Sequence, residues 1–338
     1  MNESSRVILV TGGTGFLGRS VVRRLIEIGR PVRALVRPGT PPTAFDSLLA
    51  EMPHARVELV PASFSDPAAL AAAANGVDAV LHVAASKSGS AASQVANTVV
   101  GSESLFKAAV EARVPRLVLV SSFGVMGAAA VPRGALIDEE TPLEPHPEWR
   151  DPYSFAKLRQ EQLAWKYSRE CGLPLVVVRP GVIFGPGQNL LSARVGLSLF
   201  GLFLHLGLGA TVPLTYVDNC ADAVVQAGLV PGIEGHVFCV LDDTPPSSRQ
   251  LLRRYRRQVR AIPFIPVPFP LLRTLARLNV WYTNRTQGHL PAVFTPYKVD
   301  AMWKGHRFSN ARAKSGLEWT PRVSMSEALD RTLAAQPS

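Results

Sequence analysis

The first 180 residues alternate between short apolar runs and segments with the apolar spacing of an amphipathic helix. A continuous apolar run bounded by turn residues is typical of a strand buried on both faces, as in a parallel sheet. The strands expected on this pattern are residues 6–11, 31–37, 56–60, 78–83, 116–122 and 173–179. Helices are expected over 16–28, 93–112 and from 153 to about 171. This alternation predicts an α/β fold with a doubly wound parallel sheet.

A glycine-rich turn connects the first expected strand to the first helix. Residues 11–18 read Thr-Gly-Gly-Thr-Gly-Phe-Leu-Gly. Gly12 permits a tight turn, Gly15 lets backbone amides approach a pyrophosphate, and Gly18 lets the helix pack closely on the strand. The phosphate of a dinucleotide would then lie at the positive end of the helix. The residues expected to contact this cofactor are Gly12, Thr14, Gly15, Phe16, Leu17 and Gly18.

The end of the second expected strand indicates which dinucleotide binds. Folds of this kind commonly place an acidic residue there to hold the ribose 2′-hydroxyl of NAD. This chain has Arg37 instead, with Arg33 on the same strand and no carboxylate until Asp46. Because a guanidinium pairs with a 2′-phosphate and a carboxylate repels it, NADP(H) is favoured over NAD(H). The alternative interpretation of Arg37 is a solvated surface arginine.

After residue 180 the chain leaves the expected sheet and later returns to it. A helix that begins at Asp218 and a strand over 235–241 continue the α/β pattern. We therefore expect an NADP-binding domain formed by residues 1–180 plus about 214–244. The remaining residues, about 181–213 plus 245–338, are expected to form a smaller, discontinuous C-terminal substrate-binding portion.

Tyr153 and Lys157 lie four residues apart in the expected helix, which places both side chains on one face. An ammonium beside a phenol favours the phenolate, so Lys157 is expected to lower the pKa of Tyr153. Such a tyrosine can donate or accept a proton at a carbon that bears oxygen, beside a hydride carrier. By itself the pair also fits an ordinary helix surface, so its weight depends on the rest of the chain.

Further motifs follow in a fixed order: Val-Ser-Ser-Phe-Gly-Val-Met-Gly at 120–127, Arg-Pro-Gly-Val-Ile-Phe-Gly-Pro at 179–186 and Tyr-Val-Asp-Asn-Cys-Ala-Asp-Ala at 216–223. With these motifs, the glycine-rich turn and the Tyr153–Lys157 pair, the chain resembles the extended branch of the short-chain dehydrogenase/reductase family. It is most similar there to epimerase/dehydratase-like proteins and to 3β-hydroxysteroid dehydrogenase-like reductases. The resemblance implies a Rossmann-type fold and an NAD(P)-dependent oxidoreductase that acts on CH–OH groups.

The resemblance also implies roles for individual residues. Tyr153 would be the catalytic acid and base, and Lys157 its pKa partner and a ribose ligand. Asn97 would support the lysine from a neighbouring helix. Ser122, rather than Ser121, would donate a hydrogen bond to the substrate oxygen.

Two positions depart from the family pattern. Four residues after Ser122, where many relatives carry a tyrosine, this chain has Met126, which removes a hydroxyl that some sugar-nucleotide epimerases use. Where many relatives carry an aspartate that contacts adenine, this chain has Ser63, which implies a weaker contact. The remaining cofactor contacts that we expect are Ala84, Ala85, Pro180 and Val182.

Two apolar stretches in the expected substrate-binding portion point to an apolar ligand or a lipid surface. Residues 195–217 carry no charge, and we expect a buried helix and a strand beside the substrate. Residues 261–272 contain several prolines, which disfavour a regular helix. The helix expected before them has arginines on one face, at 249, 253, 256 and 260. One interpretation is peripheral membrane contact through 195–215 and 253–272, and the other is a solvated helix face.

The composition bears on partners and location. The 338 residues are 47% hydrophobic and carry a net charge of +10, mostly from scattered arginines without a recognition motif, so we expect no nucleic-acid partner. Cys171, Cys220 and Cys239 lie far apart, so we expect neither a disulfide nor a metal site. No signal-peptide pattern is present, which favours a cytoplasmic protein, with membrane association left open.

The sequence therefore favours an NADP(H)-dependent oxidoreductase that interconverts a secondary alcohol and a ketone on an apolar, sterol-, isoprenoid- or acyl-like substrate through Ser122, Tyr153 and Lys157. The first alternative is a nucleotide-sugar epimerase or dehydratase with tightly bound NAD, against which Arg37 and Met126 argue. The second is a non-catalytic NADP-binding regulatory protein. By analogy with relatives, a homodimer is also expected.

Overall fold

A computed structural model describes residues 7–86, 89–286 and 294–336. At its centre is a parallel sheet of seven strands in the order β12-β7-β5-β4-β1-β2-β3. The order reverses between β1 and β4, as in a doubly wound fold, so the predicted fold class is confirmed. The strands are β1 Ile8–Thr11, β2 Val32–Val36, β3 Val57–Pro61, β4 Ala79–His82, β5 Leu117–Val120, β7 Leu175–Pro180 and β12 Val237–Val240.

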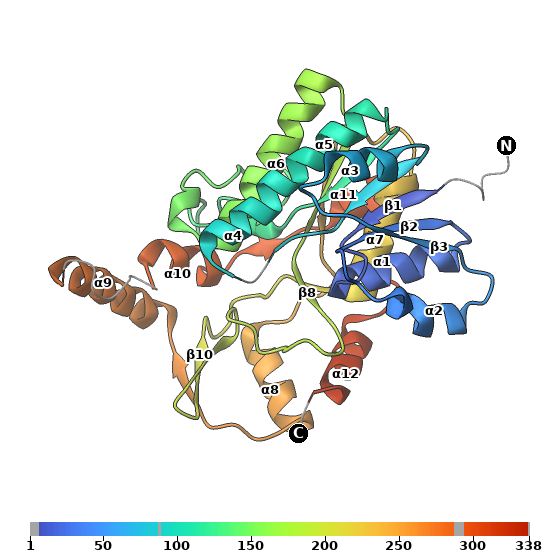
Figure 1. Cartoon of the computed structure of the whole chain (residues 1–338). Helices are drawn as coiled ribbons and strands as arrows, with labels where there is room; N and C mark the ends of the chain where they lie inside the picture. Colours follow the sequence, from blue (N-terminus) through green and yellow to red (C-terminus); the bar gives the residue numbers. More distant parts are fainter. Residues whose placement is uncertain (1–6, 87–88, 287–293, 337–338) are drawn as a thin grey trace.

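Helices cover both faces of this sheet (Figure 1). Successive residues of a strand point to opposite faces, so Ile8 and Val10 join the apolar cluster on the side of α1 and α7, whereas Leu9 joins the cluster on the side of α3, α5 and α6. The first pair is α1 Phe16–Glu27 and α7 Val217–Leu229, and the second group is α3 Pro67–Ala74, α5 Gly101–Glu111 and α6 Pro152–Cys171. A short α2, Asp46–Glu51, follows β2.

The glycine-rich turn has the geometry that its sequence predicts. Gly12 adopts a positive φ of 71°, which favours glycine. A Cβ atom on Gly18 would lie 1.9 Å from the carbonyl oxygen of Gly12, so α1 can approach β1 only without a side chain there. Gly15 is the N-cap of α1 and supplies no side-chain cap, which leaves backbone amides available to a phosphate.

The helix expected over 93–112 is interrupted. It consists of α4 Ala91–Val95, a π-helical turn over Ala96–Val100 and then α5. Asn97 lies in the π-helical turn, a conformation often found near functional sites.

The C-terminal portion departs from the sequence prediction in two places. The helix expected within 195–217 is wrong, because β9 Gly196–Leu199 and β10 Leu202–Leu206 form an antiparallel hairpin. Phe200 and Gly201, which join them, both have positive φ, as a type I′ turn requires. The expectation that residues 261–272 contain no regular helix is also wrong for its last residues, because α9 begins at Phe269. Its proline lies in the first turn, where the missing N–H costs no helical hydrogen bond.

The other elements complete this portion. β13 Phe264–Val267 pairs with β10, and β8 Val182–Phe184 pairs with β11 Leu214–Tyr216. β6 Leu136–Ile137 pairs with β14 Arg307–Phe308. The helices are α8 Ser248–Gln258, α9 Phe269–Arg285, α10 Pro296–Trp303, α11 Ala311–Gly316 and α12 Met325–Ala334.

Gly18→Ala tests the glycine-rich turn. The added Cβ would meet the backbone of the turn itself, so we expect the free energy of unfolding to fall by about 3 kcal/mol and dinucleotide binding to be lost. Thermal melting and cofactor titration measure both quantities. Gly209→Ala, where no atom lies within 4 Å of the added Cβ, is the control. Unchanged stability and cofactor affinity of Gly18→Ala would contradict the assignment.

Candidate active site

The expected site residues gather at the carboxyl ends of the central strands. Thr11 ends β1 and leads into the glycine-rich turn, and the backbone N–H of Ala84, after β4, donates to its hydroxyl at 3.3 Å. A Cβ on Gly12 would lie 2.9 Å from the Cα of Ala84, so the turn and the segment with Ala84 and Ala85 are in contact. Ligands of open α/β sheets bind at this edge, beside the strand where the order reverses.

Ser122 and Tyr153 meet at the same edge. Ser122 follows β5, and Tyr153 lies in the first turn of α6, which Asp151 caps by accepting a hydrogen bond from the Ser154 N–H at 2.9 Å. The hydroxyl of Ser122 lies beside that of Tyr153 and favours the phenolate form of the tyrosine. Ser122 also accepts a hydrogen bond from the Gly124 N–H at 3.0 Å, which fixes its rotamer.

The pKa of Tyr153 differs from the expectation. Burial raises it to about 12, the hydrogen bond from Ser122 opposes the rise, and the charge of Asp151 adds to it. The lowered pKa that we expected is therefore wrong for the protein alone, because desolvation of the phenolate outweighs the favourable contacts. Tyr153 is consequently protonated at neutral pH and able to act as a proton donor.

Lys157, one helical turn after Tyr153 on α6, is only 1% exposed. Its Nζ donates to the carbonyl oxygen of Val120 at 2.6 Å and to the side-chain oxygen of Gln160. The Gln160 amide donates in turn to Ser102 Oγ at 2.6 Å. Sequence reasoning missed Gln160, although it lies seven residues after Tyr153, on the same face of the helix.

His82 extends this network to the glycine-rich turn. Its ring nitrogens lie 2.7 Å from Thr11 Oγ1 and 2.7 Å from Ser102 Oγ, and 3.1 Å from the Gln160 amide. Burial, and then the charge of Lys157, lower the pKa of His82 to about 3, so the ring is neutral. The interpretation of His82 as structural agrees with these contacts.

A buried ion pair lies behind the serines. Arg179, in β7, donates to Glu161 of α6 at 2.6 Å and 3.2 Å, and the hydroxyl of Ser121 donates to the same carboxylate at 2.5 Å. Ser121 is thus engaged away from Tyr153, and the structure brings Ser122 to the tyrosine instead.

The support of Lys157 by Asn97 stays a prediction. The side chain of Asn97 is exposed on the π-helical turn, and the hydrogen bonds described for Lys157 go to Val120 and Gln160. Gln160 is an acceptor for the Lys157 ammonium that the sequence analysis did not include.

The expected adenosine contacts lie at the ends of β2 and β3. Arg37 is exposed directly after β2 and takes part in none of the ion pairs within the described ranges. Arg33, in contrast, pairs with Glu58 at 2.8 Å and is not available to a ligand. The hydroxyl of Ser63 lies 2.8 Å from that of Ser65.

The other predicted contacts flank the same edge. Thr14 and Gly15 are exposed, Phe16 is half-buried, and Leu17 is buried beneath them. Pro180 ends β7 and Val182 begins β8. Exposed backbone amides, an uncapped helix terminus and a turn that excludes side chains fit a dinucleotide phosphate.

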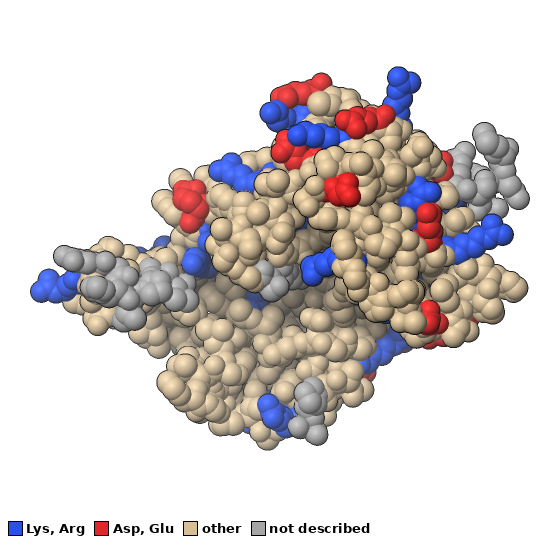
Figure 2. All heavy atoms as spheres, viewed as in Figure 1, with Lys and Arg blue, Asp and Glu red and all other residues tan. Residues whose placement is uncertain are grey.

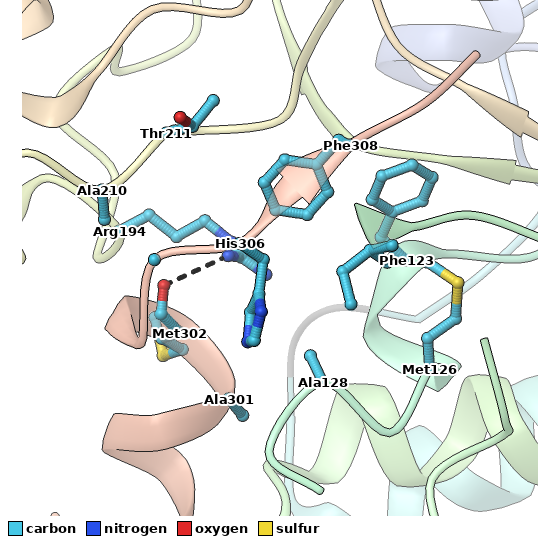
Figure 3. Close-up of a pocket in the computed structure, with 12 residues that line it drawn as sticks. Phe123, Met126, Ala128, Arg194, Ala210, Thr211, Ala301, Met302, His306 and Phe308 are labelled. Atoms are coloured by element: carbon cyan, nitrogen blue, oxygen red, sulfur yellow. Dashed lines mark hydrogen bonds between the residues drawn. The ribbon is translucent and has the colours of Figure 1, made fainter. Parts of the chain in front are cut away.

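A pocket lies between Phe123, the residue that follows Ser122, and residues of the C-terminal portion (Figure 3). Its unfilled space is about 10 Å³, so a ligand enters only when lining side chains move. The lining residues that Figure 3 labels are Phe123, Met126, Ala128, Arg194, Ala210, Thr211, Ala301, Met302, His306 and Phe308. Two of these are methionines, whose unbranched side chains adjust readily.

The described ranges contain neither a metal-ligand cluster nor a helix that could span a membrane. Within them, no group of three or more His, Cys, Asp or Glu residues is arranged to hold a metal ion. No helix in the same ranges combines the length and the apolar character needed to cross a bilayer.

The fold and the glycine-rich turn thus define a dinucleotide-binding α/β protein, in which a serine, a tyrosine and a lysine lie together at the carboxyl edge of the sheet. The model of the NAD dependent epimerase/dehydratase family matches residues 8–230, and the chain belongs to this family. The prediction of an oxidoreductase of this type, with a nicotinamide cofactor, is confirmed at the level of the family.

Relatives along the whole chain are reductases and dehydrogenases. The chain is 29% identical to a 2-alkyl-3-oxoalkanoate reductase of Stenotrophomonas maltophilia, over 97% of this chain and 98% of that protein. It is 27% identical to a 3β-hydroxysteroid-dehydrogenase/decarboxylase of Arabidopsis thaliana, over 98% and 80%. The crystal structure of gox2253 superimposes with a TM-score of 0.80 at 28% identity, over 98% of both chains.

Proposed function

We propose that the protein interconverts a secondary alcohol and a ketone on an apolar substrate, with NADP(H) as the cofactor. The observation that carries this proposal is the contact between Ser122 and a protonated Tyr153, one helical turn from the buried ammonium of Lys157. The names of the relatives, an oxoalkanoate reductase and a hydroxysteroid dehydrogenase, support the same chemistry.

In reduction, Tyr153 donates its phenolic proton to the carbonyl oxygen, and Ser122 donates a hydrogen bond that polarises the carbonyl. The charge of Lys157 stabilises the phenolate that remains. The nicotinamide ring, when bound, supplies or accepts the hydride. In oxidation the tyrosine accepts the proton from the alcohol.

The epimerase or dehydratase alternative uses the same tyrosine and lysine. Met126 argues against it, because this residue is 1% exposed and offers no hydroxyl at the position where some sugar-nucleotide epimerases use one. A non-catalytic role is less favoured, since Ser122, Tyr153 and Lys157 are all present and assembled.

We also propose that residues 1–180 plus about 214–244 bind the cofactor, and that a homodimer forms beside α5 and α6.

Tyr153→Phe tests the proposed proton donor. Turnover should fall at least about 100-fold, because general acid–base catalysis contributes that much or more. Affinity for NADP(H) should change little. A panel of sterol, long-chain keto and nucleotide-sugar substrates, followed by absorbance of the reduced cofactor, identifies the substrate first. Tyr167→Phe, further along α6, is the matched control. Turnover within about tenfold of the wild type would refute the role of Tyr153.

Arg37→Asp tests the cofactor preference. Loss of the guanidinium and gain of a carboxylate should shift the NADP(H)/NAD(H) ratio of kcat/KM by at least about 30-fold toward NAD(H), as expected for a lost charge-assisted hydrogen bond. Steady-state kinetics with both cofactors measure the ratio. Arg56→Asp, an exposed arginine before β3, is the control. An unchanged ratio in Arg37→Asp would leave the NADP(H) proposal without support.

We further propose that the protein binds the surface of an anionic bilayer through α9 and the β9–β10 hairpin. On α9, only Leu272 and Ala276 are buried. The exposed side chains of Leu271, Leu275, Leu278 and Tyr282 follow a helical spacing of 4, 3 and 4 residues and form one apolar stripe, with Trp281 beside it.

The hairpin adds a second contact. Phe200, at its tip, is 98% exposed in a backbone conformation that is costly for a bulky side chain. β10 pairs with β13, which leads directly into α9, so the two apolar surfaces belong to one continuous unit. Figure 1 shows α9 projecting from the body of the protein, and Figure 2 shows an uncharged surface over β10. The exposed Arg277 and Arg285 of α9 supply charge for anionic head groups.

Flotation with phosphatidylglycerol vesicles at low salt tests this surface. The wild type should float with these vesicles and not with neutral phosphatidylcholine vesicles. The double variant Leu275→Glu, Leu278→Glu should remain in the soluble fraction, because charges on the stripe cannot enter the interface. Leu136→Glu, an exposed leucine on β6, is the control. The proposal is contradicted if the wild type does not float with the anionic vesicles. It is also contradicted if sedimentation shows that the apolar stripe of α9 holds two copies of the chain together.

A further inference from the structure

Arg194 is a cation without an acidic partner at the edge of the pocket. None of the ion pairs in the described ranges includes it, and its only described side-chain hydrogen bond, to the carbonyl oxygen of Met302, is 3.4 Å long (Figure 3). Burial, and then the charge of Arg150, lower the pKa of Arg194 to about 10. A partly desolvated cation of this kind is costly unless an anion joins it.

The backbone of Arg194 is nevertheless held firmly. The Trp303 Nε1–H donates to the Arg194 carbonyl oxygen at 2.9 Å, and Trp303 itself is 4% exposed at the end of α10. The other cations nearby are engaged: Arg150 donates to Glu144 at 2.6 Å, and Lys304 donates to the carbonyl oxygens of Ala129 and Val131. Among the cations that the structure describes around this pocket, Arg194 is therefore the one left to bind a ligand.

His306 supplies a second, independent observation. It is 6% exposed, and neither ring nitrogen makes a hydrogen bond of good geometry within the described ranges, although the backbone of Ala128 lies beside the ring. Figure 3 shows the end of the Arg194 side chain beside His306, whose imidazole is directed toward Ala301 and Ala128, two other residues that line the pocket. A buried imidazole whose backbone contact is poorly aligned gains free energy when a ligand accepts its N–H.

The pocket adjoins the proposed reaction centre. Phe123, on its wall, directly follows Ser122, and Met126 lies four residues after that serine. The charge of Asp151, two residues before Tyr153, acts on Arg194. A group held by Arg194 would thus be close to the carbonyl carbon that Ser122 and Tyr153 address. The remaining wall is largely apolar, which suits the chain or ring that carries this group.

We infer that Arg194 and His306 form a subsite for a carboxylate of the substrate, which therefore carries that carboxylate close to the carbonyl or hydroxyl carbon that reacts. This inference rests on the proposed function. The guanidinium pairs with the two carboxylate oxygens through parallel N–H donors, and the neutral imidazole donates its N–H to one of them. A single arginine with a neutral histidine matches one small planar anion rather than a diphosphate.

The test compares 3-hydroxydodecanoate with its methyl ester, oxidised with NADP⁺. The wild type should prefer the acid, and the acid/ester ratio of kcat/KM should fall at least about 30-fold in Arg194→Met, because a charge-assisted hydrogen-bond pair is lost. His306→Phe should lower the same ratio by a smaller factor, and Arg194→Lys should lie between the wild type and Arg194→Met, since it keeps the charge without the fork. Arg133→Met, an exposed arginine near Gly305, is the control.

Calorimetric binding of 3-hydroxydodecanoate to the complex of Tyr153→Phe with NADP⁺ separates this inference from the proposed reaction. Binding that weakens at least about tenfold when Arg194→Met is added supports the subsite even if turnover is absent. Turnover of both substrates with an acid/ester ratio that Arg194→Met leaves unchanged overturns the subsite and leaves the reaction standing. Absence of acid binding to this complex overturns it as well. Melting curves of each variant verify that it is folded.

Discussion

The buried ammonium of Lys157 is the constraint on which the rest of the site depends. A lysine that is 1% exposed pays a desolvation cost of several kcal/mol, which only a complete set of acceptors can offset. Val120 at the end of β5 and Gln160 on the same helix provide acceptors, so α6 has to pack against β5 in one register. That register also fixes Tyr153, one turn before Lys157, beside Ser122.

The same network joins the reaction centre to the cofactor loop. Gln160 contacts His82 at the end of β4, and His82 contacts Thr11, where β1 gives way to the glycine-rich turn. The neutral state of His82 is part of this arrangement, because a second buried cation next to Lys157 would be repelled. Helix position, strand ends and cofactor loop are therefore set by one set of hydrogen bonds rather than by independent contacts.

The sequence predicts the parts that local rules control. The apolar runs of the central strands and the glycines at 12, 15 and 18 have few alternative conformations, and their predicted positions agree with the structure to within a few residues. The pKa of Tyr153 could not be predicted in this way, since it depends on how deeply tertiary packing buries the phenol. Gln160 was missed for a related reason: a polar residue on a helix is usually solvated, and only the packed neighbours reveal that this one is buried.

The C-terminal portion shows where apolar patterning is ambiguous. Residues 195–217 have the composition of a buried helix, but a turn at Phe200 and Gly201 makes them a hairpin whose tip is in solvent. An apolar side chain lowers free energy equally well against a protein core, a bound ligand or a bilayer, so composition alone does not distinguish them. Exposure does distinguish them: the stripe on α9 faces outward, whereas Phe123 and Met126 line a pocket that also contains a cation. The apolar stripe on α9 suits a partner with an extended surface. The pocket suits a small amphipathic molecule whose charged end lies inside it.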